Sequence, residues 1–162
     1  LSEIKLKATQ GELINYKLAI MPFSDITQHD PNWKAIQFVG VTGMIKASLE
    51  NGSALFSPDK LVTIEEIRQP FKDFYYKAQI WFDDFKEAEL TLKAAIDLIS
   101  YLAPKSPESL TKEVEKSWKT GYKFTSSFDL NKQLTRRELV TLLQAHMSPF
   151  DVNVDKNGKV VR

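Results

Sequence analysis

The chain of 162 residues has no cysteine and only two histidines, His29 and His146. Without cysteine it forms neither disulfides nor thiolate metal sites. No apolar run approaches the ~20 residues that a membrane-spanning helix needs, so we expect no membrane span. Lysine and arginine number 22 against 21 acidic residues, which gives no basic field for a nucleic-acid backbone. We therefore expect a globular protein that does not bind nucleic acid.

Hydrophobic residues make up 43% of the chain, enough for a sizeable core. The length fits one domain, and we take 1–162 as a single C-terminal module. The chain begins at Leu1 without an initiator methionine, so we expect further polypeptide, including any export signal, upstream.

Two segments, 56–67 and 128–139, share one pattern without a gap. It reads Phe, two residues, Asp or Asn, Lys, one residue, an aliphatic residue, Thr, two residues, Glu and an aliphatic residue. Spaced features that recur together indicate duplicated supersecondary structure. We expect unit one at about 21–80 and unit two at about 81–150 with a helical insert at 104–127, followed by a tail at 151–162.

A second match lies upstream of each copy. Phe23-Ser-Asp25 precedes Trp33-Lys-Ala35 by the interval that separates Phe82-Asp-Asp84 from Leu92-Lys-Ala94. Each unit is therefore predicted to begin with Phe-x-Asp and a helix, and to continue through a loop to a second helix.

Helix starts are marked by capping boxes, in which a Thr side chain and a Glu three residues later satisfy each other's backbone amides. Thr63 with Glu66 and Thr135 with Glu138 fit this pattern. Further starts are predicted at Thr9, Asp30-Pro31, Asp84 and Ser106-Pro107, and Gly43 is predicted to end a helix in a left-handed conformation.

These signals predict a mainly α fold, a bundle of about six helices with a short C-terminal β-hairpin. Ile4–Lys7 alternates and predicts a short strand, and Asn157-Gly158 predicts the hairpin turn. The predicted helices are 10–20, 31–42, 64–79 (kinked or split at Pro70), 85–102, 107–119 and 135–147.

The first unit resembles an S-layer homology motif. That family reads Phe-x-Asp, a helix with Ala-Ile, Gly-Ile-Ile, Phe-x-Pro and a Thr-Arg-x-Glu loop opening a second helix. The matching residues are Phe23-Ser-Asp25, Ala35-Ile36, Gly43-Met-Ile45, Phe56-Ser-Pro58 and Thr63-x-x-Glu66. In the second unit, Leu134-Thr-Arg-Arg-Glu-Leu139 fits the last part of the motif. Ile64 stands where the family places Arg.

Almost the whole chain resembles the C-terminal region of bacterial FAD-dependent oxidoreductases, some of which are labelled putative xanthan lyases. The resemblance rests on Pro31–Lys46, on 134–139 and on the ending Pro149–Gly158. It implies a parent protein whose upstream domain binds FAD, in the periplasm, at the cell surface or secreted. Since Gly-x-Gly-x-x-Gly is absent here, we expect no cofactor in this chain.

Catalysis is not indicated. The two histidines lie in a predicted loop and at a predicted helix end, and no spacing predicts a Ser-His-Asp triad or a metal cluster. Carboxylate pairs such as Asp83-Asp84 and Glu65-Glu66 fit helix capping and helix dipoles. We expect no catalytic residues and no metal. Residues 153–158 resemble the start of a calcium-binding loop, and calcium binding there is the alternative to a plain Asn-Gly turn.

The alternative function, glycan binding, depends on Arg136 and Arg137. In S-layer homology modules the Thr-Arg-x-Glu loop faces a groove that holds anionic cell-wall glycan, and the planar guanidinium suits such groups. Arg136 and Arg137 would then bind glycan, with Trp33 or Trp118 as a stacking face. Against this, capping accounts for Thr135 and Glu138, and both tryptophans fit a core.

An aromatic cluster over residues 71–85 is predicted to be core or a face that packs on another domain. The favoured function is a non-catalytic structural and interaction module, which docks on the upstream flavin domain of the same polypeptide or at the cell envelope. The alternative is a glycan-binding module of the cell envelope.

Overall fold

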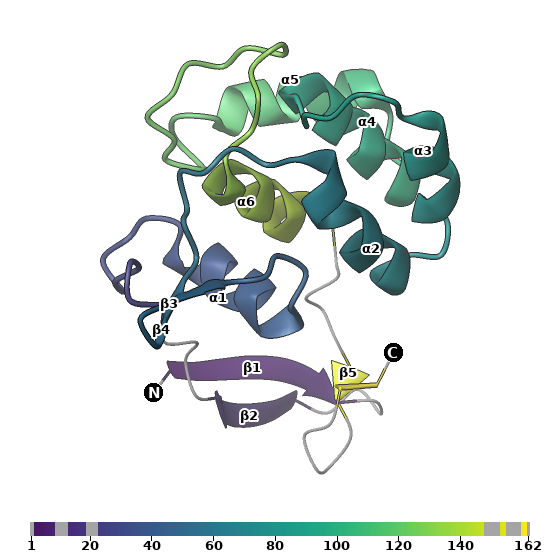
Figure 1. Ribbon diagram of the computed structural model, residues 1–162. Coiled ribbons are helices and arrows are strands. Elements are labelled where there is room, and N and C mark those ends of the chain that lie inside the picture. The colour runs from purple at the N-terminus through teal and green to yellow at the C-terminus, as the bar shows by residue number, and fades with distance from the viewer. Residues whose placement is uncertain (1, 9–12, 19–22, 148–152, 155–159, 162) are drawn as a thin grey trace.

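The computed structural model describes residues 2–8, 13–18, 23–147, 153–154 and 160–161. Over these residues the chain is mainly α, with the helices gathered into one body and a small sheet beside it (Figure 1). The helices are α1 (Trp33–Thr42), α2 (Ile64–Phe74), α3 (Ala78–Asp84), α4 (Leu92–Leu102), α5 (Pro107–Ser117) and α6 (Arg136–His146). None of the described helices is long and apolar enough to cross a membrane.

Three of the helices begin in the same way. The side chains of Thr63, Thr91 and Thr135 cap α2, α4 and α6, each accepting a hydrogen bond from the backbone amide three residues later. The capping boxes predicted at Thr63–Glu66 and Thr135–Glu138 are confirmed. Thr91 was not predicted as a cap.

The residues just before these caps form a closed ring of backbone hydrogen bonds. Val62 N donates to Leu134 O (2.9 Å), Leu134 N donates to Leu90 O (2.9 Å), and Leu90 N donates to Val62 O (3.4 Å). All three side chains are fully buried. The three capped helices are therefore arranged around a common centre and related by an approximate threefold axis.

The remaining three helices complete this arrangement. Helix α1 packs against α6, α3 against α2, and α5 against α4. The helices thus form the pairs α1–α2, α3–α4 and α5–α6 along the chain, and the first helix of each pair packs on the second helix of another pair. The last contact, between α1 and α6, closes the circle (Figure 1).

The core lies inside this circle. Each capped helix buries the apolar side chains that lie four and eight residues after its Thr, because residues four apart lie on one helix face. One such layer is Ile67, Ala95 and Leu139, and the next is Phe71, Ile99 and Leu143.

A four-stranded sheet brings the two ends of the chain together in the order β2-β1-β5-β6. Strand β1 (Ser2–Ala8) pairs antiparallel with β2 (Leu13–Leu18) and parallel with β5 (Asn153–Val154), which pairs antiparallel with β6 (Val160–Val161). The predicted strand near Ile4–Lys7 and the pairing of the terminal hairpin are confirmed. The turn around Asn157-Gly158 and the cap at Thr9 lie outside the described residues.

A second hairpin was not predicted. It joins β3 (Ser48–Glu50) to β4 (Ser53–Leu55). The two turn residues, Asn51 and Gly52, have φ of +50° and +78°, the left-handed conformation that a two-residue hairpin turn demands. Gly43, at φ +72°, ends α1 in the left-handed conformation that was predicted.

Three predicted helices need correction. The helix predicted over 64–79 is divided between α2 and α3, and the break follows Phe74, whereas Pro70 lies inside α2. Residues 13–18 are strand β2, because Ile14, Tyr16 and Leu18 alternate along a strand that pairs with β1. The helix predicted over 85–102 begins only at Leu92, since Thr91 provides its cap and Asp84 ends α3 instead of starting a helix.

The two predicted units, at about 21–80 and 81–150, do not coincide with the three helix pairs. The stretch expected as an insert at 104–127 contains α5, the first helix of the third pair. The two Phe-x-Asp segments differ in structure. Phe23-Ser-Asp25 lies in the loop before α1, whereas Phe82-Asp-Asp84 forms the end of α3.

Candidate functional site

Arg136 lies at the first position of α6 and points into the protein, with 4% of the residue exposed. Its Nη1 donates to the carbonyl oxygen of Phe56 (2.6 Å), and its Nη2 lies 3.0 Å from Oε2 of Glu66. The guanidinium therefore joins the start of α6 to the loop before α2 and to the first turn of α2.

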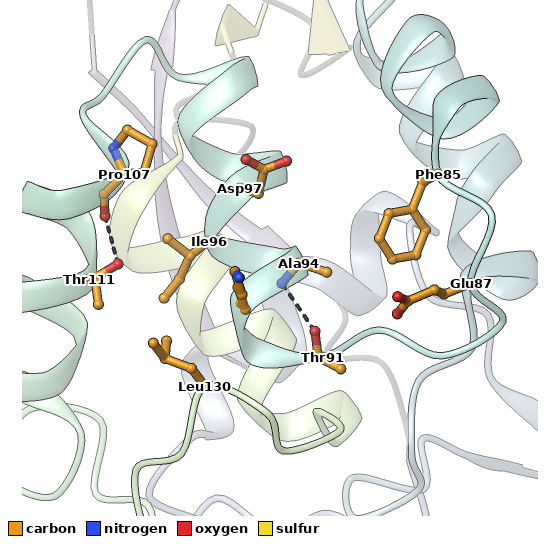
Figure 2. A pocket seen from close by; sticks show the side chains of 10 residues that line it. Phe85, Glu87, Thr91, Ala94, Ile96, Asp97, Pro107, Thr111 and Leu130 are labelled. Atoms are coloured by element: carbon orange, nitrogen blue, oxygen red, sulfur yellow. Dashed lines mark hydrogen bonds between the residues drawn. The ribbon is translucent and has the colours of Figure 1, made fainter.

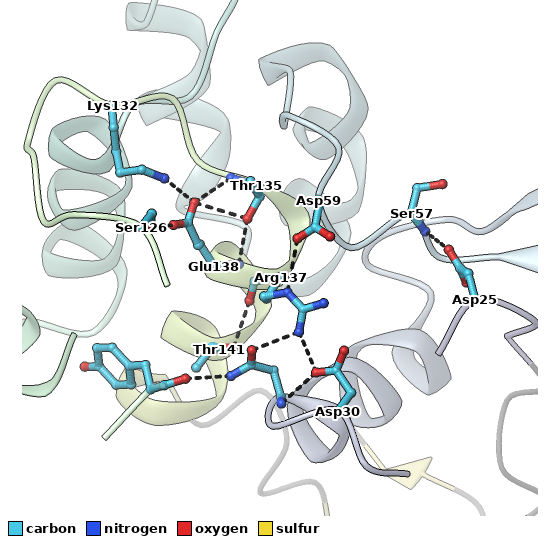
Figure 3. A network of polar contacts seen from close by, with 12 residues as sticks. Asp25, Asp30, Ser57, Asp59, Ser126, Lys132, Thr135, Arg137, Glu138 and Thr141 are labelled. Atoms are coloured by element: carbon cyan, nitrogen blue, oxygen red, sulfur yellow. Dashed lines mark hydrogen bonds and ion pairs between the residues drawn. The ribbon is translucent and has the colours of Figure 1, made fainter. Parts of the chain in front are cut away.

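Arg137 binds two acidic segments from the first half of the chain (Figure 3). Its Nη1 donates to Asp30 Oδ1 (2.5 Å) and Asn32 Oδ1 (3.1 Å), and its Nε donates to Asp59 Oδ1 (3.2 Å). Burial alone would lower the pKa of Arg137, but the hydrogen bonds and charges of Asp30 and Asp59 outweigh it and raise the pKa. The guanidinium is thus held charged between α1 and the loop before α2.

Glu138 completes the cluster at the start of α6. Its Oε1 accepts from Thr135 N (2.9 Å) and forms an ion pair with Lys132, while its Oε2 accepts from the Ser126 hydroxyl (2.6 Å). Burial works to raise the pKa of Glu138, but the hydrogen bonds from Lys132, Ser126 and Thr135 and the charge of Lys132 lower it overall. Each charge of the Thr-Arg-Arg-Glu segment therefore has a partner inside the protein, and Figure 3 shows the partners of Arg137 and Glu138.

Asp25 explains the Phe-x-Asp pattern of the first unit. Its carboxylate accepts from the backbone amides of Phe56 (3.0 Å) and Ser57 (2.7 Å). Ser57 has a φ of +57°, so the carboxylate fixes a left-handed turn in the loop before α2. This role is structural.

The residues predicted to bind glycan lie mostly inside. Arg136 and Trp118 are 4% and 1% exposed, so a glycan at the surface reaches neither side chain. Trp118 donates from Nε1 to Ser126 O (2.8 Å) and packs in the core. Arg137 and Trp33 are half-buried, the former in its ion pairs and the latter against the core. The four residues do not form one open surface.

A separate hollow of about 400 Å³ opens beside the start of α4 (Figure 2). Sequence analysis did not predict it, because its walls come from three separate parts of the chain. Its polar side chains are Glu87, Lys93, Asp97 and two threonines. Lys93 is exposed and lines the hollow, and its side chain forms no hydrogen bond or ion pair with the described residues. The full lining is Phe85, Glu87, Thr91, Lys93, Ala94, Ile96, Asp97, Pro107, Thr111 and Leu130.

One wall of this hollow is rigid. The Phe85 ring stacks on the Trp81 ring with centroids 4.7 Å apart and planes 12° from parallel. The Trp81 Nε1 donates to Asp97 Oδ2 (2.9 Å), which holds that carboxylate in place. Phe85 and Glu87 lie on the loop side of α4, while Pro107, Thr111 and Leu130 lie on its other side (Figure 2).

A second hollow of about 340 Å³ lies between α1, α5 and α6. Behind it the Tyr122 hydroxyl contacts His146 Nε2, and both residues are buried. Burial raises the pKa of Tyr122 to about 12. Burial also lowers the pKa of His146. The charge of Glu113 opposes this shift, and the charge of Lys105 adds to it. This pair is therefore neutral near pH 7.

The two histidines are not brought together, since His29 is exposed in the loop before α1 and His146 is buried at the end of α6. Among the described residues no group of three or more histidine or acidic side chains could hold a metal ion. Gly40 and Gly43 lie in and after the last turn of α1, so they form no strand-turn-helix cradle for a dinucleotide.

The aromatic cluster over residues 71–85 divides in two. Phe71, Trp81 and Phe82 belong to the core. Tyr76, just before α3, is 85% exposed, and Ile80 on α3 is 62% exposed. Tyr76 lies in the turn that leads into α3 and Ile80 in the first turn of α3, so the two exposed side chains are close along the chain.

Comparisons with protein-family models, with curated proteins and with solved structures found no match for this chain. The resemblance to S-layer homology motifs and to the C-terminal region of FAD-dependent oxidoreductases therefore depends on the motif residues alone and stays a prediction.

Proposed function

We propose that this chain is a non-catalytic structural and interaction module of a larger bacterial polypeptide, a secreted or periplasmic FAD-dependent oxidoreductase. The module would dock on the upstream flavin domain of the same polypeptide. FAD belongs to that upstream domain in this proposal, and the present chain contributes no cofactor ligand.

The organisation of the charged motif supports a structural role. Arg136, Arg137 and Glu138 all engage partners within the protein, and these partners lie in other helix pairs or loops. A reaction centre or an anion site would need such groups to converge on a ligand. Here they join the third helix pair to the first and bind the loop that precedes α6.

The observation that carries the docking proposal is the exposed pair Tyr76 and Ile80. Large apolar side chains that are exposed close together along the chain are typical of surfaces that pack on another domain. The flavin domain is the occupant that the family resemblance implies.

The test uses the complete polypeptide encoded by the gene. Amide hydrogen exchange of residues 72–85 would be compared in the isolated chain and in the complete polypeptide, which should also show flavin absorbance. Docking predicts slower exchange at 72–85 in the complete polypeptide, and the variant Tyr76→Ser/Ile80→Ser should abolish the difference. Leu49→Ser is the matched control, because Leu49 is 79% exposed on β3, at a distant part of the fold.

Equal exchange in both forms would refute docking on the flavin domain. A complete polypeptide without bound flavin would refute the parent assignment.

Binding of an envelope glycan is the alternative proposal. It is supported by the hollow at Lys93, where the fixed Phe85 ring stands beside polar and charged side chains. Purified envelope glycans should then shift the amide resonances of the residues that line the hollow, and a glycan that shifts none of them would count against this alternative.

A further inference from the structure

Tyr122 joins the loop after α5 to two other parts of the fold. Its hydroxyl contacts Nε2 of His146, the last residue of α6. Its carbonyl oxygen accepts a hydrogen bond from Nδ2 of Asn32 (2.8 Å), the residue just before α1. Asn32 Oδ1 in turn accepts from Nη1 of Arg137 (3.1 Å), at the start of α6. The loop is thus bound both to the end of α6 and to the segment that leads into α1.

His146 is buried with one of its two ring nitrogens unpaired. The residue is 7% exposed, and its Nδ1 forms no hydrogen bond with the described residues. Oε2 of Glu113 on α5 lies 3.9 Å from Nδ1, beyond hydrogen-bond distance, on a side chain that is 58% exposed. Lys105, in the loop before α5, contributes a positive charge. These surroundings accommodate a neutral imidazole.

Protonation changes what the ring of His146 needs. An imidazolium carries N–H groups on both nitrogens, so Nδ1 would be a charged, buried donor without an acceptor. Burying such a group is unfavourable. The charge of Lys105 increases the cost, and the charge of Glu113 reduces it without cancelling the effect of burial, so the pKa of His146 is lowered overall. The proton is therefore better accommodated when His146 is exposed to water.

The loop around Tyr122 is the part that can move. Lys123 has a φ of +59°, a left-handed conformation that is strained for a residue with a side chain. Within residues 119–125 only Tyr122 and Phe124 are buried. The second hollow, of about 340 Å³, already lies between this loop, the start of α1 and the last turns of α6. Loss of the contact with His146 would let the loop move outward and widen this hollow.

We propose that Tyr122 and His146 form a pH-sensitive contact that controls how firmly α1 is held on α6. Protonation of His146 releases the loop 119–124, and Asn32 then loses the Tyr122 carbonyl oxygen as an acceptor. Because the packing of α1 on α6 closes the circle of helices, acidification weakens this closure before the rest of the fold. The inference goes beyond the proposed function and does not depend on the docking partner.

The test measures amide hydrogen exchange of the 162-residue chain at pH 7.5 and pH 5, as protection factors that remove the intrinsic pH dependence of exchange. The reporters are the amides of Tyr122 and Phe124 in the loop and of Ile36 in α1, which all donate to backbone carbonyls. Because exposed His146 regains the ordinary pKa of 6.5, their protection should fall by up to about 30-fold between the two pH values. Low concentrations of urea should leave this exchange unchanged, since a local opening exposes little surface.

Two exposed neighbours of His146 provide variants of opposite sign. The charge of Glu113 favours protonation of the buried ring, and the charge of Lys105 disfavours it. Glu113→Gln should therefore lower the midpoint of the His146 titration followed by NMR. Lys105→Gln should raise this midpoint and reduce the loss of protection at pH 5. His146→Phe should remove the loss, whereas His29→Gln, at an exposed site, is the control and should keep it.

Protection factors in the loop that stay the same between pH 7.5 and pH 5 would overturn the proposal. So would a loss that persists in His146→Phe. A loss that urea enhances as much as it enhances exchange at Ala95 in α4 would also overturn it, because the whole protein would then be opening. A loss confined to the loop, with Ile36 unchanged, would refute the transmission through Asn32 to α1.

Discussion

Arg136 donates a hydrogen bond to the carbonyl oxygen of Phe56, which lies 2.6 Å away in space and 80 residues earlier in the chain. The same guanidinium lies 3.0 Å from Glu66 in the first turn of α2. One buried side chain therefore joins the third helix pair to the first. It stands at a motif position where the resemblance predicted a ligand-binding group.

Replacing Arg136 with methionine should destabilise the protein strongly. The change leaves the buried Phe56 carbonyl and the Glu66 carboxylate without their partner, and we expect the free energy of unfolding to fall by about 3 kcal/mol. Urea denaturation followed by circular dichroism measures it. Lys116→Met, at an exposed site, should change the value by less than about 0.5 kcal/mol. A loss below about 1 kcal/mol for Arg136→Met would show that the contact to Phe56 contributes little.

Thr91→Ala tests whether the third capped helix is equivalent to the other two. Thr91 Oγ1 accepts from Ala94 N at 3.2 Å, and its removal should cost about 1 kcal/mol of unfolding free energy. Thr135→Ala should cost more, because Glu138 is bound to that cap as well. Thr120→Ala, an exposed position after α5, is the control. A neutral Thr91→Ala would mean that α4 does not depend on its cap.

The lowered pKa of Glu138 predicts a loss of stability in acid. A carboxyl group whose pKa is lower in the folded state binds fewer protons there than in the unfolded state. Its contribution is therefore complete above the ordinary pKa of 4.5 and declines as the pH falls through the folded-state value. Urea midpoints measured from pH 6 to pH 3 should fall more steeply for the wild type than for Glu138→Gln. Parallel curves would contradict the assignment.

His146 should add a second pH dependence nearer to neutrality. Burial lowers its pKa below 6.5, so the unfolded chain takes up a proton that the folded protein resists. Stability from this group is complete above pH 6.5 and declines on acidification through the folded-state pKa. The groups facing His146 are Tyr122, Glu113 and Lys105. Thermal melts between pH 7.5 and 5.5 should become flatter in His146→Phe, whereas His29→Gln, at an exposed site, should keep the wild-type slope.

Local signals in the sequence predicted local structure well. The capping boxes at Thr63 and Thr135 were predicted because both partners of each box lie within four residues. The Ser106-Pro107 start of α5 was predicted for the same reason. Thr91 was missed because Ala94 occupies the position of the expected Glu, so half of the signal is absent. The hairpin turn at Asn51-Gly52 did carry a signal, the Asn-Gly pair.

The candidate site was harder to predict, because its residues come together only through tertiary packing. The hollow at Lys93 combines α4 with Pro107 and Leu130, which are far apart in the chain. Burial of Arg136 and Trp118 likewise depends on how the helix pairs meet, and the motif alone suggested exposed groups. Strand β2 was not predicted, because its conformation depends on pairing with β1. In the sequence, the alternation of apolar and polar residues over 13–18 was outweighed by the helix start predicted at Thr9.

The contact between α1 and α6 has a consequence for how this protein is made. A ribosome delivers α1 long before α6, and until α6 emerges α1 has no helix to pack against and Val62 N has no acceptor at Leu134. Intermediate chains would expose the apolar face of α1 that α6 later covers, since contacts between distant segments form late. Shortening the chain before α6 should therefore yield an aggregating fragment and not a smaller, stable protein.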